Sequence, residues 1–227
     1  MTRISDTTDP VALVVGAGPG IGAAVAARFA TAGYAVGLIA RDEQRLVRLA
    51  AGLDTRTAVA TADATVPEEL TDAIAAVRAE LGPPEALCFS PIPDVDLIRP
   101  VLDTGPGELM ASLGLGIGGA SAAVRSVLPD LLDRGRGSLL FTTGSAGLHP
   151  DPERAASAVT TTATTTYVAL LRRALDGTGV RVGHTVIVGP VDRERDDAHH
   201  PDRVAADLWA HHRGRADAFP SVLRLRT

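Results

Sequence analysis

The chain has 227 residues, of which 45% are hydrophobic and only 3% are aromatic, and its formal net charge is −5. This length predicts one domain spanning residues 1–227, with a core of small and branched side chains. Both signs of charge are spread along the chain, so it has no basic stripe for a phosphate backbone, which argues against a nucleic-acid partner.

The first ten residues carry Asp6 and Asp9 and no apolar run, so we expect a flexible N-terminus and not a secretory signal. No stretch reaches the roughly 20 apolar residues that span a bilayer, so we expect no membrane partner. The single cysteine, Cys88, fits a reducing compartment, and its apolar surroundings favour a buried side chain over a catalytic thiol. We therefore expect a cytoplasmic protein.

Runs rich in Val, Ile and Leu alternate with stretches of helical spacing, which predicts an α/β fold with a mainly parallel sheet and helices on both faces. The predicted strands are residues 11–15, 35–40, 57–61, 86–90, 138–143 and 180–188, with a seventh near Val222. The predicted helices are residues 20–32, one carrying Leu46, Leu49 and Leu53, one opening at Pro67, then about 108–132, one ending near Asp176, and 201–212. Residues 189–214 are expected to form a substrate loop and helix.

Two of these helices have unusual compositions. Residues 113–120 contain four glycines, which predict close packing or a local break, because each glycine costs a helix up to about 1 kcal/mol. Residues 160–166 contain six threonines, whose branched side chains lower helix propensity. We expect that second helix to depend on tertiary packing.

A glycine-rich segment, Val15-Gly16-Ala17-Gly18-Pro19-Gly20-Ile21-Gly22, stands between the first predicted strand and its helix. Such glycines permit a tight turn and let the backbone reach a pyrophosphate, which then lies at the positive end of the helix. We therefore predict that Gly16, Gly18, Gly20, Ile21 and Gly22 bind a dinucleotide cofactor. The alternative is a glycine-rich turn that serves packing alone.

The second predicted strand ends at Ala40 and is followed by Arg41. A protein that prefers NAD places an acidic side chain here for the ribose 2′-hydroxyl, whereas a guanidinium suits a 2′-phosphate. The sequence therefore favours NADP(H) over NAD(H). In the alternative, Arg41 is a solvated charge that begins the next helix.

The spacing of Gly16 from Gly20-Ile21-Gly22 resembles that of the short-chain dehydrogenase/reductase family, and the resemblance covers nearly the whole chain. It implies a Rossmann-type doubly wound sheet of seven strands and a small-molecule substrate. Asp63 matches the family's adenine-contacting aspartate, Ala64 is its neighbour, and Ser90 follows the fourth strand beside the cofactor. The small residues of the helices at the family's usual dimer surface imply a homodimer or homotetramer.

The family's catalytic set of Asn, Ser, Tyr and Lys is missing. Counting along the chain from the flanking motifs places Gly116, Gly144, Ser157 and Thr161 at the four positions. All 22 basic Lys or Arg residues are arginine, so no realignment supplies a lysine. Tyr34 enters the second strand, and Tyr167 lies about 80° around the helix from the required face, so we expect both to pack.

Other residues at the carboxyl edge of the sheet could replace the missing set. His149, on the loop after the fifth strand, is the leading candidate because histidine titrates near neutral pH, although it could be a plain surface residue. Thr143 and Ser145 could hydrogen-bond a substrate oxygen, as could Ser157 and Thr161. Asp94 and Asp96 are weaker candidates at the same edge.

Residues 196–202 contain aspartates and histidines without the spacing of a metal site, so we expect a polar lid loop and no metal. The following helix is expected to be anchored by Trp209. It closes with His211 and His212, where a cation would be favourable.

Three functions remain open. The first is an NADPH-dependent reductase that uses water or His149 as its proton source. The second is a non-redox enzyme, such as a cyclase, isomerase or dehydratase, that kept the fold. The third is a regulatory protein that reports nucleotide state, since a fold alone does not determine function.

Overall fold

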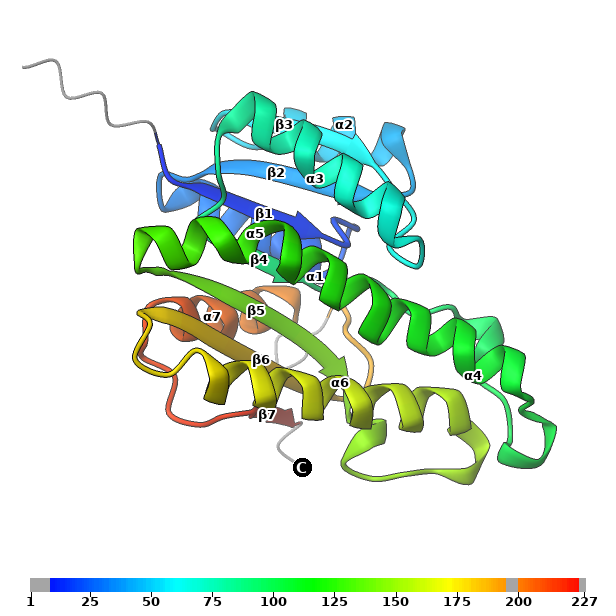
Figure 1. Cartoon of the computed structure of the whole chain (residues 1–227). Coiled ribbons are helices and arrows are strands. Elements are labelled where there is room, and N and C mark those ends of the chain that lie inside the picture. The colour runs from blue at the N-terminus through cyan, green and yellow to red at the C-terminus, as the bar shows by residue number, and fades with distance from the viewer. Residues whose placement is uncertain (1–8, 195–199, 225–227) are drawn as a thin grey trace, which may run out of the picture.

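The computed structural model describes residues 9–194 and 200–224 (Figure 1). Residues 1–8, most of the segment expected to be flexible, lie outside the described residues. So do residues 195–199, which belong to the expected substrate loop and hold part of the aspartate and histidine run.

Seven strands form one parallel sheet, as predicted, in the order β3-β2-β1-β4-β5-β6-β7. They are β1 (Val11–Val15), β2 (Ala35–Ala40), β3 (Thr57–Thr61), β4 (Ala86–Phe89), β5 (Gly137–Gly144), β6 (Val180–Val188) and β7 (Ser221–Arg224). Because every pairing is parallel, the carboxyl ends of all strands meet at one edge of the sheet. The order reverses between β1 and β4, where ligands bind in open sheets of this kind.

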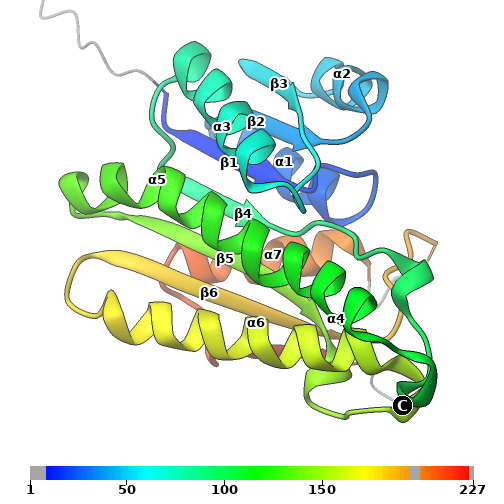
Figure 2. The same ribbon diagram turned by 45° about the vertical axis from the view of Figure 1, so that its right-hand side comes forward.

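Helices cover both faces of the sheet, which buries the strands in two separate hydrophobic clusters (Figure 2). One face carries α1 (Ile21–Thr31), α2 (Glu43–Ala51) and α7 (Pro201–His212). The other carries α3 (Pro67–Leu81), α4 (Pro106–Leu113), α5 (Ala120–Arg134) and α6 (Ala155–Ala174). This double cover explains why β1 is a continuous apolar run with every residue buried.

The helix predicted at about 108–132 begins at Pro106 and is interrupted by a π-helical segment, Gly114–Gly119. Both expectations for its glycines are confirmed, because the helix breaks locally and a side chain at Gly119 would collide with the carbonyl oxygen of Ala64. By length and composition alone, the run Pro106–Arg134 could cross a membrane, which the sequence analysis did not anticipate. In the structure this run packs beside α3 and α6.

Threonine hydroxyls of α6 donate hydrogen bonds to main-chain carbonyl oxygens of the same helix. Four of them lie 2.8–2.9 Å from the carbonyl oxygen four residues earlier, to which they donate; these are Thr161, Thr162, Thr164 and Thr165. Their methyl groups remain available for packing against neighbouring elements. The helix contacts α4, β5 and β6, which supply the tertiary packing that its composition requires.

The carboxyl end of α7 departs from expectation. Trp209 anchors the helix as predicted, 5.1 Å from the ring of Phe29. His212, however, is buried, and burial lowers its pKa to about 4. Its ring nitrogens lie 2.9 Å from the Tyr34 hydroxyl and 2.7 Å from the Ser138 hydroxyl. The prediction of a cation at this helix end is therefore wrong for His212, which is a neutral link between α7, β5 and Tyr34, the residue before β2.

This link predicts acid sensitivity of the fold. His212 titrates near 6.5 in the unfolded chain and near 4 in the folded one, so the unfolded state binds the proton first as pH falls. The stabilisation is complete above pH 6.5 and is lost toward pH 4, at a cost of up to about 3 kcal/mol by the ~1.36 kcal/mol per pKa unit rule. Urea unfolding between pH 7.5 and 4 should show a free energy that falls with pH.

A matched pair of variants tests the assignment. His212→Gln should be less stable at pH 7 yet less sensitive to pH, whereas His149→Gln, at an exposed position, should keep the wild-type slope. An unchanged slope in His212→Gln would contradict the role of His212.

Candidate functional site

The glycine loop turns sharply out of β1. The main-chain N–H groups of Gly16 and Ala17 donate to the carbonyl oxygen of Ile39 at 2.9 and 3.1 Å. Gly16 has a φ of +88°, and a Cβ there would lie 2.5 Å from main-chain atoms of Ser90 and Pro91. At Gly22, a Cβ would collide with the carbonyl oxygen of Gly16. These two glycines are required by the protein's own packing.

Gly18 and Gly20 differ from that pair. A Cβ at Gly20 would meet nothing within 4 Å, and one at Gly18 would make ordinary contacts with the end of the Ile92 side chain at 3.8 Å and the carbonyl oxygen of Gly16 at 4.0 Å. No described side chain caps the first turn of α1. Packing does not require these glycines, and the open backbone above a helix N-terminus fits the pyrophosphate of a dinucleotide.

Arg41 and Asp63 lie together where β2 and β3 end. Asp63 accepts hydrogen bonds from the N–H and hydroxyl of Thr65 at 2.9 and 2.8 Å. The N–H bond chiefly lowers the pKa of this carboxyl, and the charge of Arg41 lowers it further. Ala64 is buried next to Asp63, against Gly119. The exposed Arg41 thus stands beside an ionised carboxylate at the expected ribose end of the site.

A cavity of about 390 Å³ adjoins the glycine loop, and three arginines are among the eight residues that line it. Its lining comprises Ala17, Gly18, Pro19, Ala23, Arg45, Arg48, Leu49 and Arg193. Arg45 pairs with Asp42 at 2.9 Å. The sequence analysis missed these arginines, although the i, i+3 spacing of Arg45 and Arg48 after Arg41 would have marked a cationic helix face.

The family position of the asparagine, Gly116, is filled by its neighbours. A Cβ there would collide with the Thr160 methyl group and lie 2.8 Å from the Thr164 hydroxyl. Thr164 also donates to the carbonyl oxygen of Gly116 at 3.1 Å, and Ser112 and Thr160 hydroxyls lie 2.7 Å apart. The helix α6 therefore occupies the space that an asparagine side chain would need.

The other three positions are less constrained. A Cβ at Gly144 would meet nothing within 4 Å. Thr161 donates to the carbonyl oxygen of Ser157 at 2.8 Å, which holds its hydroxyl within the helix. Both side chains are half-buried on α6. Tyr167 packs against the core cluster as expected, and Tyr34 is engaged by His212.

The substitute candidates gather on β5 and the connection that follows it. Ser145 is half-buried, and its carbonyl oxygen accepts the N–H of the exposed His149 at 3.1 Å. Asp94 caps a short turn by accepting the Asp96 N–H at 2.9 Å, so its carboxylate is used locally. Ser90, at the end of β4, lies 2.6 Å from the Thr142 hydroxyl.

Thr143 has a partner that the sequence analysis missed. Its hydroxyl lies 2.9 Å from Nε2 of His184, a fully buried residue of β6. Burial, with the nearby His211, lowers the pKa of His184 to about 4, so its ring is neutral at pH 7. A lone histidine within an apolar strand was the signal that could have revealed it. His184 orients the Thr143 hydroxyl, and because its ring is neutral it is not a general acid near pH 7.

Two further observations concern the metal-ligating side chains and the single cysteine. Among residues 9–194 and 200–224, no three His, Cys, Asp or Glu side chains come together as a metal site would require. Cys88 is buried as expected, and burial raises its thiol pKa to about 12, which removes it as a nucleophile.

Comparison with known proteins decides the family. The model of the short chain dehydrogenases matches residues 10–203. This chain is a member of that family. The family binds nicotinamide cofactors, and the chain is a short-chain dehydrogenase/reductase-type oxidoreductase by this membership.

The chain is similar to a named reductase and to oxidoreductases of known structure. Sulfoacetaldehyde reductase 2 of Chromohalobacter salexigens is 34% identical over 189 residues, covering 76% of this chain and 69% of its own length. A metagenomic short-chain oxidoreductase in complex with NADP superposes with a TM-score of 0.79 at 22% identity, over 96% of both chains. An NADPH-bound short-chain oxidoreductase of Pseudomonas aeruginosa with an atypical catalytic center superposes with 0.74 at 23% identity, over 81% of this chain and 72% of that one.

The packing at Gly116 predicts that the family's asparagine cannot be restored without a loss of stability, whereas its serine can be. Gly116→Asn should overpack the contact with α6 and lower stability by roughly 1–3 kcal/mol. Gly144→Ser, at an open position, should change it by less than about 0.5 kcal/mol. Thermal and urea unfolding measure both, and equal stabilities for the two variants would contradict the packing argument.

Proposed function

We propose that this protein is an NADP(H)-dependent oxidoreductase that acts on a small molecule by a mechanism without the tyrosine and lysine pair. The observation that carries the proposal is the exposed Arg41 beside Asp63, next to the open backbone of Gly18 and Gly20. The arginine-lined cavity adds Arg45 and Arg48 on the α2 side of the same loop. A 2′-phosphate bound here would meet cations where an NAD-specific protein has a carboxylate.

In this proposal, residues at the carboxyl edge of the sheet bind either the cofactor or the substrate. The glycine loop, with Ile21 and Gly22 at the start of α1, holds the pyrophosphate, and Arg41, Asp63, Ala64 and Ser90 flank the remaining cofactor. The nicotinamide supplies or accepts a hydride when bound. The Thr143 and Ser145 hydroxyls hydrogen-bond the substrate oxygen, with Thr143 held by His184 at 2.9 Å. The proton for that oxygen comes from water or from the exposed His149.

The P. aeruginosa oxidoreductase is a precedent for NADPH binding beside an atypical catalytic center on the same fold. At 23% identity, its likeness to this chain is one of fold.

A second candidate function is a non-redox enzyme that retains the cofactor cleft. The filled space at Gly116 favours it, because α6 occupies the position of a catalytic side chain and leaves no room for its return. The two functions differ in whether the bound cofactor is oxidised or reduced during turnover.

Cofactor preference is tested by calorimetric titration with NADPH and NADH. We expect NADPH to bind more tightly, and Arg41→Ala to weaken NADPH by about 10- to 100-fold with little effect on NADH, because only NADPH carries the 2′-phosphate. Arg125→Ala, an exposed arginine on α5, is the matched control and should bind as wild type. If NADPH and NADH bound equally to the wild type, the NADP assignment would be wrong.

Redox use is tested by following NADPH absorbance during incubation with a panel of aldehydes and ketones that includes sulfoacetaldehyde. We expect oxidation that is unchanged in Tyr167→Phe, since that side chain packs in the core, and reduced in Thr143→Val, which keeps the shape but removes the hydroxyl. Tight NADPH binding with no oxidation across the panel would favour the non-redox function. Loss of activity in Tyr167→Phe would show that a tyrosine-driven reaction persists.

A further inference from the structure

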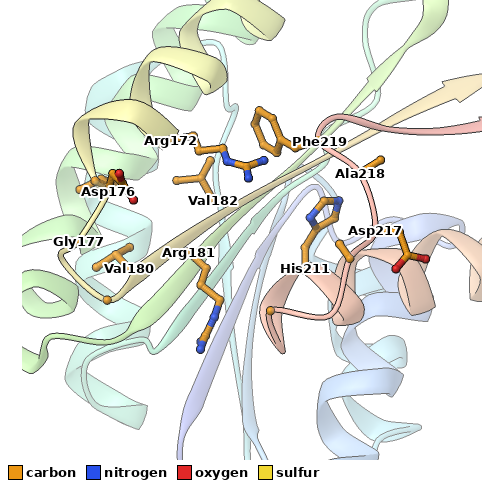
Figure 3. Close-up of a pocket in the computed structure, with 14 residues that line it drawn as sticks. Arg172, Asp176, Gly177, Val180, Arg181, Val182, His211, Asp217, Ala218 and Phe219 are labelled. Carbon is orange, nitrogen blue, oxygen red and sulfur yellow. The ribbon is translucent and has the colours of Figure 1, made fainter.

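A second cavity, of about 560 Å³, lies at the amino end of β6, away from the glycine loop (Figure 3). Its floor is the start of β6, at Val180, Arg181 and Val182. One wall is the end of α6, with Arg172 and Leu175, and the other is the connection between α7 and β7. None of the residues assigned above to cofactor or substrate lines this cavity.

The cavity exposes an incomplete edge of the sheet. β5 pairs with β6 from Val180 to Ile187. On the other side, β7 pairs only with residues 185–188, so residues 180–184 have no neighbouring strand there. At about 3.3 Å per residue, this open edge could hold three or four residues of an extended chain.

Ladder geometry shows which main-chain groups face the opening. Ser138 donates its N–H to Glu85, toward β4, so Leu139 must use its main-chain groups toward β6. Its hydrogen bonds go to Arg181 and Gly183, which leaves the N–H and C=O of Val182 directed outward. These outward groups have no hydrogen bond to any residue in the described part of the chain, whereas the N–H of Val180 is met by the Thr178 hydroxyl at 3.2 Å.

The lining supplies a cation beside this edge. The guanidinium of Arg172 stacks on the ring of Phe219, 4.1 Å from its centre, and lines the cavity together with Val182 (Figure 3). Within the described residues, no carboxylate lies within 4.0 Å of Arg172, although Asp176 and Asp217 belong to the same lining. Stacking on Phe219 leaves the planar N–H groups of Arg172 free to bind a carboxylate from the side.

We propose that this cavity binds the carboxyl-terminal end of an extended peptide. The peptide adds to β6 as a short parallel strand below β7, with its main chain on Val182 and its terminal carboxylate on Arg172. Leu175, Val180 and Phe219 provide apolar contacts for its side chains. Addition to a sheet edge supplies affinity through main-chain hydrogen bonds, and a carboxylate clamp selects a chain end. The site is separate from the cofactor cleft, so the proposal stands or falls independently of the proposed function.

The test is calorimetric titration of the full chain with the peptide acetyl-Ala-Ala-Val-Ala carrying a free carboxylate. We expect one-to-one binding that weakens at least about tenfold when the carboxylate is replaced by an amide. Methylation of the valine amide nitrogen should also abolish binding, because it blocks the strand pairing. Arg172→Ala should weaken the free acid by about tenfold or more, and Arg173→Ala, its exposed neighbour outside the cavity lining, should not.

Each contrary result overturns the proposal. If the free-acid and amide peptides bound with equal affinity, Arg172 would not bind the terminal carboxylate. If the N-methylated peptide bound as well as the unmethylated one, the peptide would not pair with β6 as a strand. If binding of the free-acid peptide did not saturate, the protein would have no specific site for it. Displacement of the peptide by NADPH would place it in the cofactor cleft. The comparisons between peptides use the wild-type protein, so they remain decisive even if Arg172→Ala fails to fold.

Discussion

The fold of the cofactor cleft depends on the close approach of α1 to the end of β1. Gly16 lets the glycine loop meet the chain that follows β4, since a Cβ there would lie 2.5 Å from main-chain atoms of Ser90 and Pro91. Gly22 lets α1 meet the end of β1, since a Cβ there would collide with the carbonyl oxygen of Gly16. That contact aims the N-terminus of α1 at the carboxyl edge of the sheet, where β1 and β4 diverge. The open backbone at Gly18 and Gly20 follows from it, and with it the capacity to hold a pyrophosphate.

A second close contact, between two helices, removes the space for one of the family's catalytic side chains. The threonine-rich α6 packs against the glycine segment of the α4–α5 helix so tightly that Thr160 and Thr164 fill the place of the family's asparagine. The departure from the family at Gly116 is therefore a change of packing as well as of residue type. The face of α6 next to Gly116 is an interface between two helices.

The two ends of β6 have different surroundings for a simple reason. At the carboxyl end, β7 completes the sheet, at the same edge as the residues proposed to bind the cofactor. At the amino end β7 has not yet begun, so outward main-chain groups meet a cavity instead of a strand. Histidines mark the boundary: His211 and His184 are both buried between these regions, and burial keeps the pKa of each below its usual value.

The sequence alone determined the α/β fold, the order of its strands and helices, the glycine loop and the absence of lysine, because these depend on local periodicity and on residue types at short spacing. It also located Arg41 and Asp63, since both follow directly from strand ends. It did not reveal His184 beside Thr143, the neutral His212 or the arginine cavity, because each joins residues far apart in the chain. Only the tertiary structure could show that Gly116 is filled by Thr160 or that β6 has an open edge, since both depend on how closely separate elements approach.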